Sequence, residues 1–316
     1  MLRILVFIFN LFIFGKALIL TPQNIIDNQS EITSMQIHNH ILYVSSINGK
    51  LNLYNLNSLK FQKSIIIPSH KDILDKIQVP KVTSTSTNNL NQTLITATNQ
   101  YGSSNLFLND KDLSLILENL EIIKTIWISD TQAIIALLSN EILLLDIPTK
   151  KIIYKSQISQ SSLSDIVFSQ DLNLLFSTGE SGIIYAINPQ DGTILYKINN
   201  IHKDKIFQLA LAKQTLISGG EDRKVSIFNL QNPTMPHILK SSFLVYAVGI
   251  NSNATHIAYM EDEVGNISLF SLQNHKVIAS LRGMKGIINT ILFYKDYMIV
   301  SCDESKIYFF NLKGVI

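Results

Sequence analysis

The chain has 316 residues, of which 16% are charged and 46% are hydrophobic, and its formal net charge is +2. This length is large for one ordinary domain. The near balance of 26 basic and 24 acidic side chains gives no reason to expect a nucleic acid or an anionic membrane as partner. The single cysteine, Cys302, excludes an intrachain disulfide.

Residues 1–17 differ in composition from the rest of the chain and have the features of a secretory signal peptide. Arg3 gives a positive start, residues 4–14 form an apolar run, and Gly15-Lys16-Ala17 offers small residues for cleavage. An apolar run of about eleven residues is too short to span a bilayer of roughly 30 Å. We therefore expect cleavage, export to the periplasm and no stable membrane span afterwards, with an uncleaved anchor as the alternative. Cleavage would leave 24 basic and 24 acidic residues, a net charge of zero.

A pattern of alternating apolar and polar residues begins at residue 34 and recurs twice. Residues 34–56, 208–230 and 290–312 align without a gap, with their apolar residues in the same columns. The alternation has the period of two that is typical of strands. The clearest copy contains residues 216–230, LISGGEDRKVSIFNL, in which a glycine-rich turn joins two strands. Each copy therefore predicts three short strands.

The spacing of these copies predicts the architecture. Leu230 follows Leu56 by 174 residues and precedes Leu312 by 82, so four units of about 43 residues and two of about 41 fit between them. This is the period of β-propeller blades. We predict one all-β domain, residues 18–316, folded as a seven-bladed β-propeller. The other four units are placed at residues 81–120, 123–154, 163–198 and 246–281.

A fourth, outer strand follows each unit except the last, after which only residues 313–316 remain. Residues 18–22, LILTP, resemble residues 65–68, IIIP, in the outer strand of the first unit. We therefore predict that residues 18–22 form an N-terminal strand that pairs with the last blade and closes the ring. Such closure would cover an otherwise exposed sheet edge.

Residues 217–230, ISGGEDRKVSIFNL, resemble a WD40 repeat. The resemblance implies a buried hydrogen-bond network of His202, Ser218 and Asp222, which occupy the positions where that family keeps its His, Ser and Asp. Phe228 replaces the Trp that would complete the network. Residues 182–198, GIIYAINPQDGTILYKI, instead resemble the repeat of quinoprotein-type propellers, although the chain is shorter than the usual quinone-dependent enzymes.

Motifs for catalysis or cofactor binding are scarce. The sequence has no P-loop, no dinucleotide-binding glycine motif, no HExxH and no GxSxG. His38 and His40 would share one face of a strand, as a metal site requires, but the alignment places them in a turn, and no third ligand can be named. We therefore expect no catalytic residues, no cofactor and no metal.

The turns inside the units and the links between them are predicted to lie on one face of the ring. A rigid ring that presents loops of mixed charge is typical of a platform for another protein. The chain also resembles the propellers encoded with periplasmic nitrate reductases, which implies an accessory factor with reductase subunits as partners. We expect the protein to be a monomer. The alternatives are a scaffold for another envelope complex, such as outer-membrane assembly, and a quinoprotein-like enzyme. The candidate contact residues are His70, Lys71, Tyr101, His202, Lys203, Lys205, Glu221, Arg223, Met284, Lys285 and Lys306.

Overall fold

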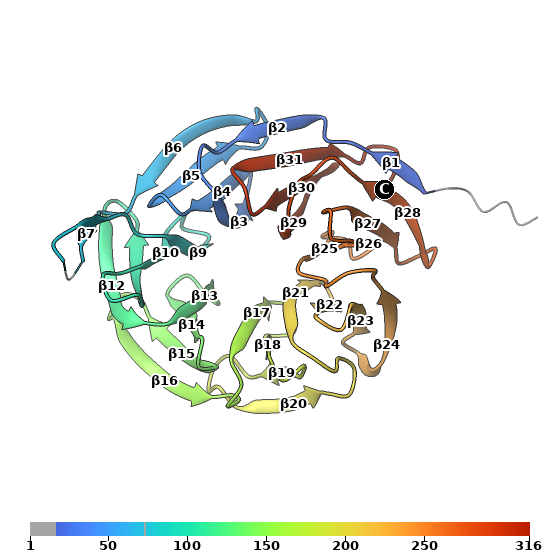
Figure 1. The fold of residues 1–316 in the computed structure, drawn as a ribbon. Helices are drawn as coiled ribbons and strands as arrows, with labels where there is room; N and C mark the ends of the chain where they lie inside the picture. Colours follow the sequence, from blue (N-terminus) through green and yellow to red (C-terminus); the bar gives the residue numbers. More distant parts are fainter. Residues whose placement is uncertain (1–16, 73) are drawn as a thin grey trace, which may run out of the picture.

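A computed structural model describes residues 17–72 and 74–316, and every regular element among them is a β-strand. Seven sheets, each built on four antiparallel strands, surround a central axis, as Figure 1 shows. The predicted seven-bladed β-propeller is therefore confirmed. The predicted signal peptide lies outside the described residues, apart from residue 17. The described residues contain no helix that is long and apolar enough to cross a membrane.

Each blade has an innermost strand at the axis and an outermost strand at the rim. The first four blades contain, from the inside outwards, β3 (Ile32–His38), β4 (Ile41–Ser46), β5 (Lys50–Asn55) and β6 (Lys60–Ile66); β9 (Val82–Thr87), β10 (Thr93–Thr98), β11 (Ser104–Asn109) and β12 (Leu113–Leu120); β13 (Ile122–Trp127), β14 (Gln132–Leu137), β15 (Glu141–Asp146) and β16 (Lys151–Gln157); and β17 (Leu163–Ser169), β18 (Leu174–Gly179), β19 (Ile184–Ile187) and β20 (Ile194–Ile198).

The last three blades repeat this order. They contain β21 (Ile206–Ala212), β22 (Thr215–Gly220), β23 (Lys224–Asn229) and β24 (Asn232–Lys240); β25 (Val248–Ile250), β26 (His256–Met260), β27 (Ile267–Ser271) and β28 (Lys276–Leu281); and β29 (Ile288–Tyr294), β30 (Tyr297–Cys302) and β31 (Lys306–Asn311), which an N-terminal strand completes. The repeat in the sequence therefore predicted the position of every blade.

The strand that completes blade 7 is β2 (Asn24–Asp27), which pairs antiparallel with β31. Ring closure by an N-terminal strand is therefore confirmed, but the prediction that residues 18–22 form that strand was wrong. β1 (Leu18–Leu20) instead runs parallel to β28 and adds a fifth strand to blade 6. Pro22 has no N–H to donate to a ladder, whereas Ile26 of β2 packs against the core between blades 7 and 1.

The core lies between adjacent blades, because both faces of each sheet are covered by neighbouring sheets. The middle strands are consequently buried along nearly their whole length, as in β14 and β15. Such strands appear as continuous apolar runs, for example ILLL in residues 142–145. The outermost strands are largely exposed, as in β6 and β16. The ring is thus built from seven interblade layers of apolar side chains.

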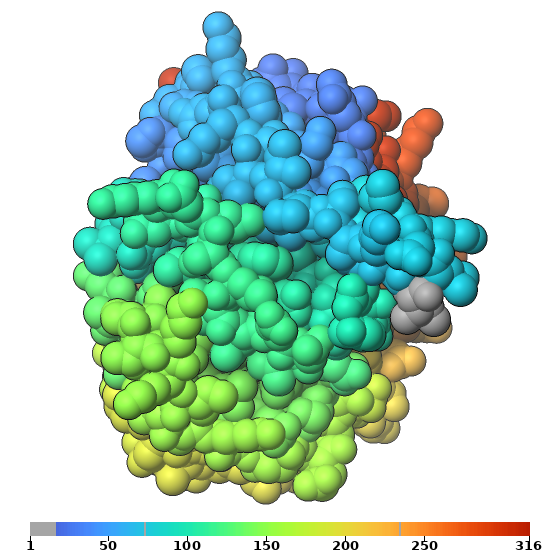
Figure 2. All heavy atoms as spheres, turned by 90° about the vertical axis from the view of Figure 1, so that its left-hand side faces the viewer, coloured from blue at the N-terminus to red at the C-terminus, as the bar shows by residue number. Residues whose placement is uncertain are grey.

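The link between blades 1 and 2 departs from the regular pattern. It spans residues 67–81, whereas every other link between blades has between one and seven residues. Within it, β7 (His70–Lys71) and β8 (Ile77–Gln78) form an antiparallel hairpin of their own. The hairpin projects beyond the ring in Figure 1 and stands out at the right-hand edge of Figure 2.

Candidate functional site

The two ends of the ring carry different loops. Because neighbouring strands are antiparallel, the links between blades and the turns between second and third strands emerge on the same face, which we call the link face. The candidate contact residues belong to these links and turns, except Lys306, which is the first residue of β31 and directly follows such a turn. Six of them are exposed and three are half-buried: Lys71, Tyr101, Lys203, Glu221, Arg223 and Lys285, and His70, Lys205 and Lys306.

His202 and Met284 cannot serve as contact residues, and their inclusion in the predicted contact surface was wrong. His202 is 6% exposed and Met284 is 5% exposed. Both lie four residues before the first residue of an innermost strand, Ile206 and Ile288 respectively. Asn28 has the same position before Ile32 and is also buried. In these three links, the residue at this position is a buried anchor that packs beneath the loops.

In blade 5 the anchor is a hydrogen-bonded histidine. His202 Nδ1 lies 2.8 Å from Asp222 Oδ1, and its Nε2 lies 2.9 Å from Ser218 Oγ and 3.1 Å from Ser226 Oγ. Asp222 Oδ2 also accepts a hydrogen bond from the backbone N–H of Lys203 and lies 3.0 Å from Lys224 Nζ. The network therefore joins the link into blade 5 to two strands and a turn of that blade.

Burial and hydrogen bonding together determine the ionisation of this network. Burial lowers the pKa of His202, against the opposing effect of Asp222. Burial alone would raise the pKa of Asp222, but hydrogen bonds from His202, Lys224 and the Lys203 backbone together lower it. The pair is therefore a neutral imidazole and a carboxylate near pH 7, with the Nδ1–H donating to Asp222.

The anchor in blade 1 uses different chemistry at the same place. Asn28 Nδ2 donates to Ser46 Oγ over 2.9 Å, and Asn28 Oδ1 accepts from Asn52 Nδ2 and from the hydroxyl of Tyr54. In blade 7 the anchor is apolar, since Met284 belongs to the same buried cluster as Cys302. The last residue of the second strand differs between these blades together with the anchor. It is Ser46 where the anchor is Asn28, Gly220 where it is His202, and Cys302 where it is Met284.

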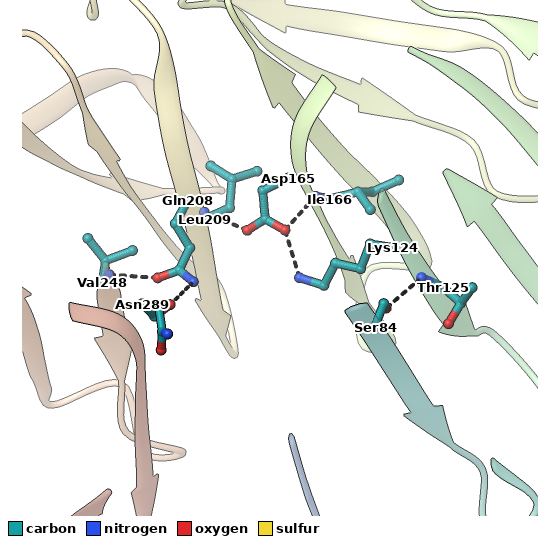
Figure 3. Close-up of polar contacts among 9 residues, drawn as sticks. All are labelled: Ser84, Lys124, Thr125, Asp165, Ile166, Gln208, Leu209, Val248 and Asn289. Atoms are coloured by element: carbon teal, nitrogen blue, oxygen red, sulfur yellow. Dashed lines mark hydrogen bonds and ion pairs between the residues drawn. The ribbon is translucent and has the colours of Figure 1, made fainter. Parts of the chain in front are cut away.

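The central channel is a cavity of about 530 Å³ lined by the innermost strands of all seven blades. Side chains there connect neighbouring blades, as Figure 3 shows. Backbone N–H groups of Thr125, Leu209 and Val248 donate to Ser84, Asp165 and Gln208 respectively, each acceptor lying on the preceding blade. Ala247 has the corresponding place in blade 6, and its methyl group can make no such bond.

Lys124 and Asp165 are the charged pair of this channel, and the sequence patterns did not single them out. Lys124 Nζ lies 2.7 Å from Asp165 Oδ1, across the junction of blades 3 and 4. The Asp165 carboxylate also accepts from the backbone N–H groups of Ile166 and Leu209. Its hydrogen-bonding capacity is therefore used to hold three blades together.

The hairpin link carries exposed apolar side chains that the repeat alignment also passed over. Leu74 is 69% exposed, Ile77 75% and Val79 52%, and Tyr101 in the adjacent turn of blade 2 is 67% exposed. We call these four side chains the hairpin patch. Large apolar side chains this exposed commonly mark contact sites when they gather in one place. The feature of the sequence that could have revealed this hairpin is the extra length of the segment between the first two units.

The two histidines weighed as metal ligands do not form a cluster with further ligands. His38 ends β3 and is half-buried, and His40 is exposed in the following turn. Across residues 17–72 and 74–316, no group of three or more His, Cys, Asp and Glu side chains is placed to hold a metal ion.

No protein-family model and no curated protein matches this sequence. Among solved structures, the chain is similar to a chain of the crystal structure of the mitotic checkpoint complex, with a TM-score of 0.77 and 12% sequence identity. The similarity covers 98% of each chain. At this identity it shows the shared WD40-type propeller fold.

Proposed function

We propose that this protein is a non-catalytic platform that binds another protein through the link face. The observation that carries the proposal is the hairpin patch: three exposed apolar side chains on the one link that departs from the regular pattern, and Tyr101 in the adjacent turn of blade 2. Exposed apolar side chains do not stabilise a loop that contacts only water. Because the rigid ring already holds them in place, binding a partner through them loses little conformational entropy. The similar chain of the mitotic checkpoint complex, itself part of an assembly, supports protein binding as a use of this fold.

Co-purification of the native partner tests this proposal. The partner of the wild-type protein is identified from the source cells and then quantified with two variants. The double substitution Ile77→Ser and Val79→Ser should reduce the recovered partner at least tenfold, since apolar contacts in an interface centre are strongly weakened by polar groups. Leu90→Ser is the matched control, because Leu90 is 58% exposed in a turn on the opposite face of blade 2.

The cellular site of this platform is proposed to be the periplasm. The support is the sequence of residues 1–17, with its positive start, short apolar run and small residues before Leu18. β1 begins at Leu18, directly after the expected cleavage site. Mass spectrometry of the N-terminus of the exported protein tests cleavage after residue 17.

A narrower proposal is that the partner is a subunit of a periplasmic nitrate reductase, the role associated with the propeller NapL. It rests on the resemblance of the sequence in composition and architecture. Co-purified reductase subunits that disappear with the Ile77 and Val79 variant would support it. A different partner with the same dependence would reject this narrower proposal and keep the platform.

A further inference from the structure

A pocket lies between the hairpin link and the link-face end of blade 2. Its volume is about 430 Å³, which is within the range of small binding sites. Tyr101 lies both in its wall and in the hairpin patch, so we call it the Tyr101 pocket. Its walls include Pro68, His70, Pro80, Tyr101, Phe107 and Glu118.

The sheet is irregular at this pocket and regular at the same place in the other blades. The ladder between β11 and β12 shifts register between Ser104 and Leu106, opposite Glu118 and Asn119, in addition to a second shift further along. The corresponding ladders of the other blades have at most one shift, at their opposite end. Asn119 has a φ of 57°, in the left-handed region. Bulges of this kind redirect side chains and are common beside binding sites.

A network of amides holds the bulge in this shape. Asn99 Nδ2 donates to Asn105 Oδ1 over 3.1 Å and to Asn119 Oδ1 over 2.9 Å. Asn99 Oδ1 accepts from the backbone N–H of Tyr101 and from the hydroxyl of Ser103. The turn that carries Tyr101 and the bulge that carries Glu118 are therefore fixed relative to each other.

The pocket is suited to a cation. Glu118 is exposed and forms no ion pair with any described residue, and none of the lining residues is Lys or Arg. Tyr101 and the two prolines provide flat apolar walls beside this carboxylate. A guanidinium group can stack on an aromatic ring while it forms paired hydrogen bonds with a carboxylate.

We propose that the Tyr101 pocket binds an arginine side chain of the partner protein, next to the apolar contact made by the hairpin patch. This inference rests on the proposed platform function and names one chemical feature that the partner must present. The apolar patch would supply affinity, and the carboxylate would select for the basic residue beside it.

Titration with Nα-acetyl-arginine amide, followed by backbone amide NMR shifts, tests the pocket in the isolated protein. We expect saturable shifts at Tyr101, Ser103 and Asn119. Glu118→Gln keeps the shape and removes the charge, and it should weaken binding about fivefold, as expected for a partly exposed ion pair. Glu180→Gln, at an exposed turn of blade 4 on the same face, should leave binding unchanged.

Three results would overturn the proposal: no saturable shift, shifts that Glu118→Gln leaves unchanged, or equal shifts with Nα-acetyl-glutamate amide. These results are distinguishable from a failure of the platform function. If the arginine probe does not bind while the Ile77 and Val79 substitutions still release the native partner, the proposed platform function is retained and the proposed arginine site is rejected. If the probe binds but those substitutions release no partner, the platform itself is wrong.

Discussion

His202 Nδ1 lies 2.8 Å from Asp222 Oδ1, and the two groups join the link into blade 5 to the turn that caps the same blade. Both loops belong to the link face. The pair therefore lies beneath the proposed contact face and holds the two loops above it in one arrangement. A platform that binds without rearranging loses little conformational entropy.

The stability of the fold should fall in mild acid because of His202. Burial holds the folded pKa of His202 below its unfolded value of about 6.5, so the unfolded chain binds more protons as the pH falls. The contribution of His202 is thus complete above pH 6.5 and is lost below it, with a slope of at most about 1.4 kcal/mol per pH unit. Urea unfolding of the wild type and of His202→Gln between pH 5 and 8 measures the free energy of unfolding against pH. If the slope of the variant in mild acid were as steep as that of the wild type, His202 would not be the cause.

Gly220→Ala should destabilise the protein through contact with His202. A β-carbon on Gly220 would lie 2.7 Å from His202 Nδ1 and 3.0 Å from the carbonyl oxygen of Lys205. Overpacking of this kind costs about 1–3 kcal/mol. The double variant with His202→Ala should lose less stability than the sum of the two single variants, because the clash is then relieved. Additive losses in thermal and urea unfolding would show that the two residues do not interact.

Asp165→Asn should weaken the junctions around the central channel. In Asp165 one oxygen contacts Lys124 and the other accepts from the backbone N–H of Leu209. An asparagine has one oxygen and one NH2 group, and the NH2 group cannot accept, so one buried hydrogen bond is lost at a cost of about 1–3 kcal/mol. Glu141→Gln is the control, since its ion pair with Lys155 is more exposed and should contribute about 0–1 kcal/mol. Equal midpoints of urea unfolding for the two variants would count against the proposed role of Asp165.

The N-terminal closure is tested by two adjacent isoleucines of β2. Ile26 packs into the layer between blades 7 and 1, whereas Ile25 is 52% exposed. Ile26→Ala should therefore cost about 1–2 kcal/mol, and Ile25→Ala less than about 0.5 kcal/mol. Deletion of residues 18–22 should leave blade 7 intact, because β2 completes it. Because this deletion also removes β1 from blade 6, the readout is amide hydrogen exchange in β31, and faster exchange there would restore the original assignment of the closing strand.

The repeat in the sequence was sufficient to predict the fold, because each blade contributes the same apolar columns. The period of about 41–43 residues located even the weakly matching units, such as residues 81–120, now seen as β9 to β12. The closing strand was placed in the wrong N-terminal segment because LILTP and NIID are both apolar enough to pair. They are distinguished by Pro22, which has no N–H to donate, and by Ile26, which packs in the layer that contains Ile307.

The site was predicted less well, for reasons specific to single residues. Met284 was chosen as a contact because it lies in a loop, yet its column is the buried anchor of the link, as Asn28 shows. Lys124 and Asp165 are 41 residues apart and meet only when neighbouring blades stack. The hairpin patch has no counterpart in the other units, so an alignment of repeats could not reveal it.

Photo-crosslinking tests the central claim, that the link face binds a partner through the hairpin patch, most directly. A photoreactive amino acid is placed at position 77 in one variant and at position 90 in another, each in cells that contain the native partner. The proposed function predicts one crosslinked partner at position 77 and little or none at position 90 on the opposite face. Crosslinks of equal yield at both positions, or a partner captured only at position 90, would contradict it.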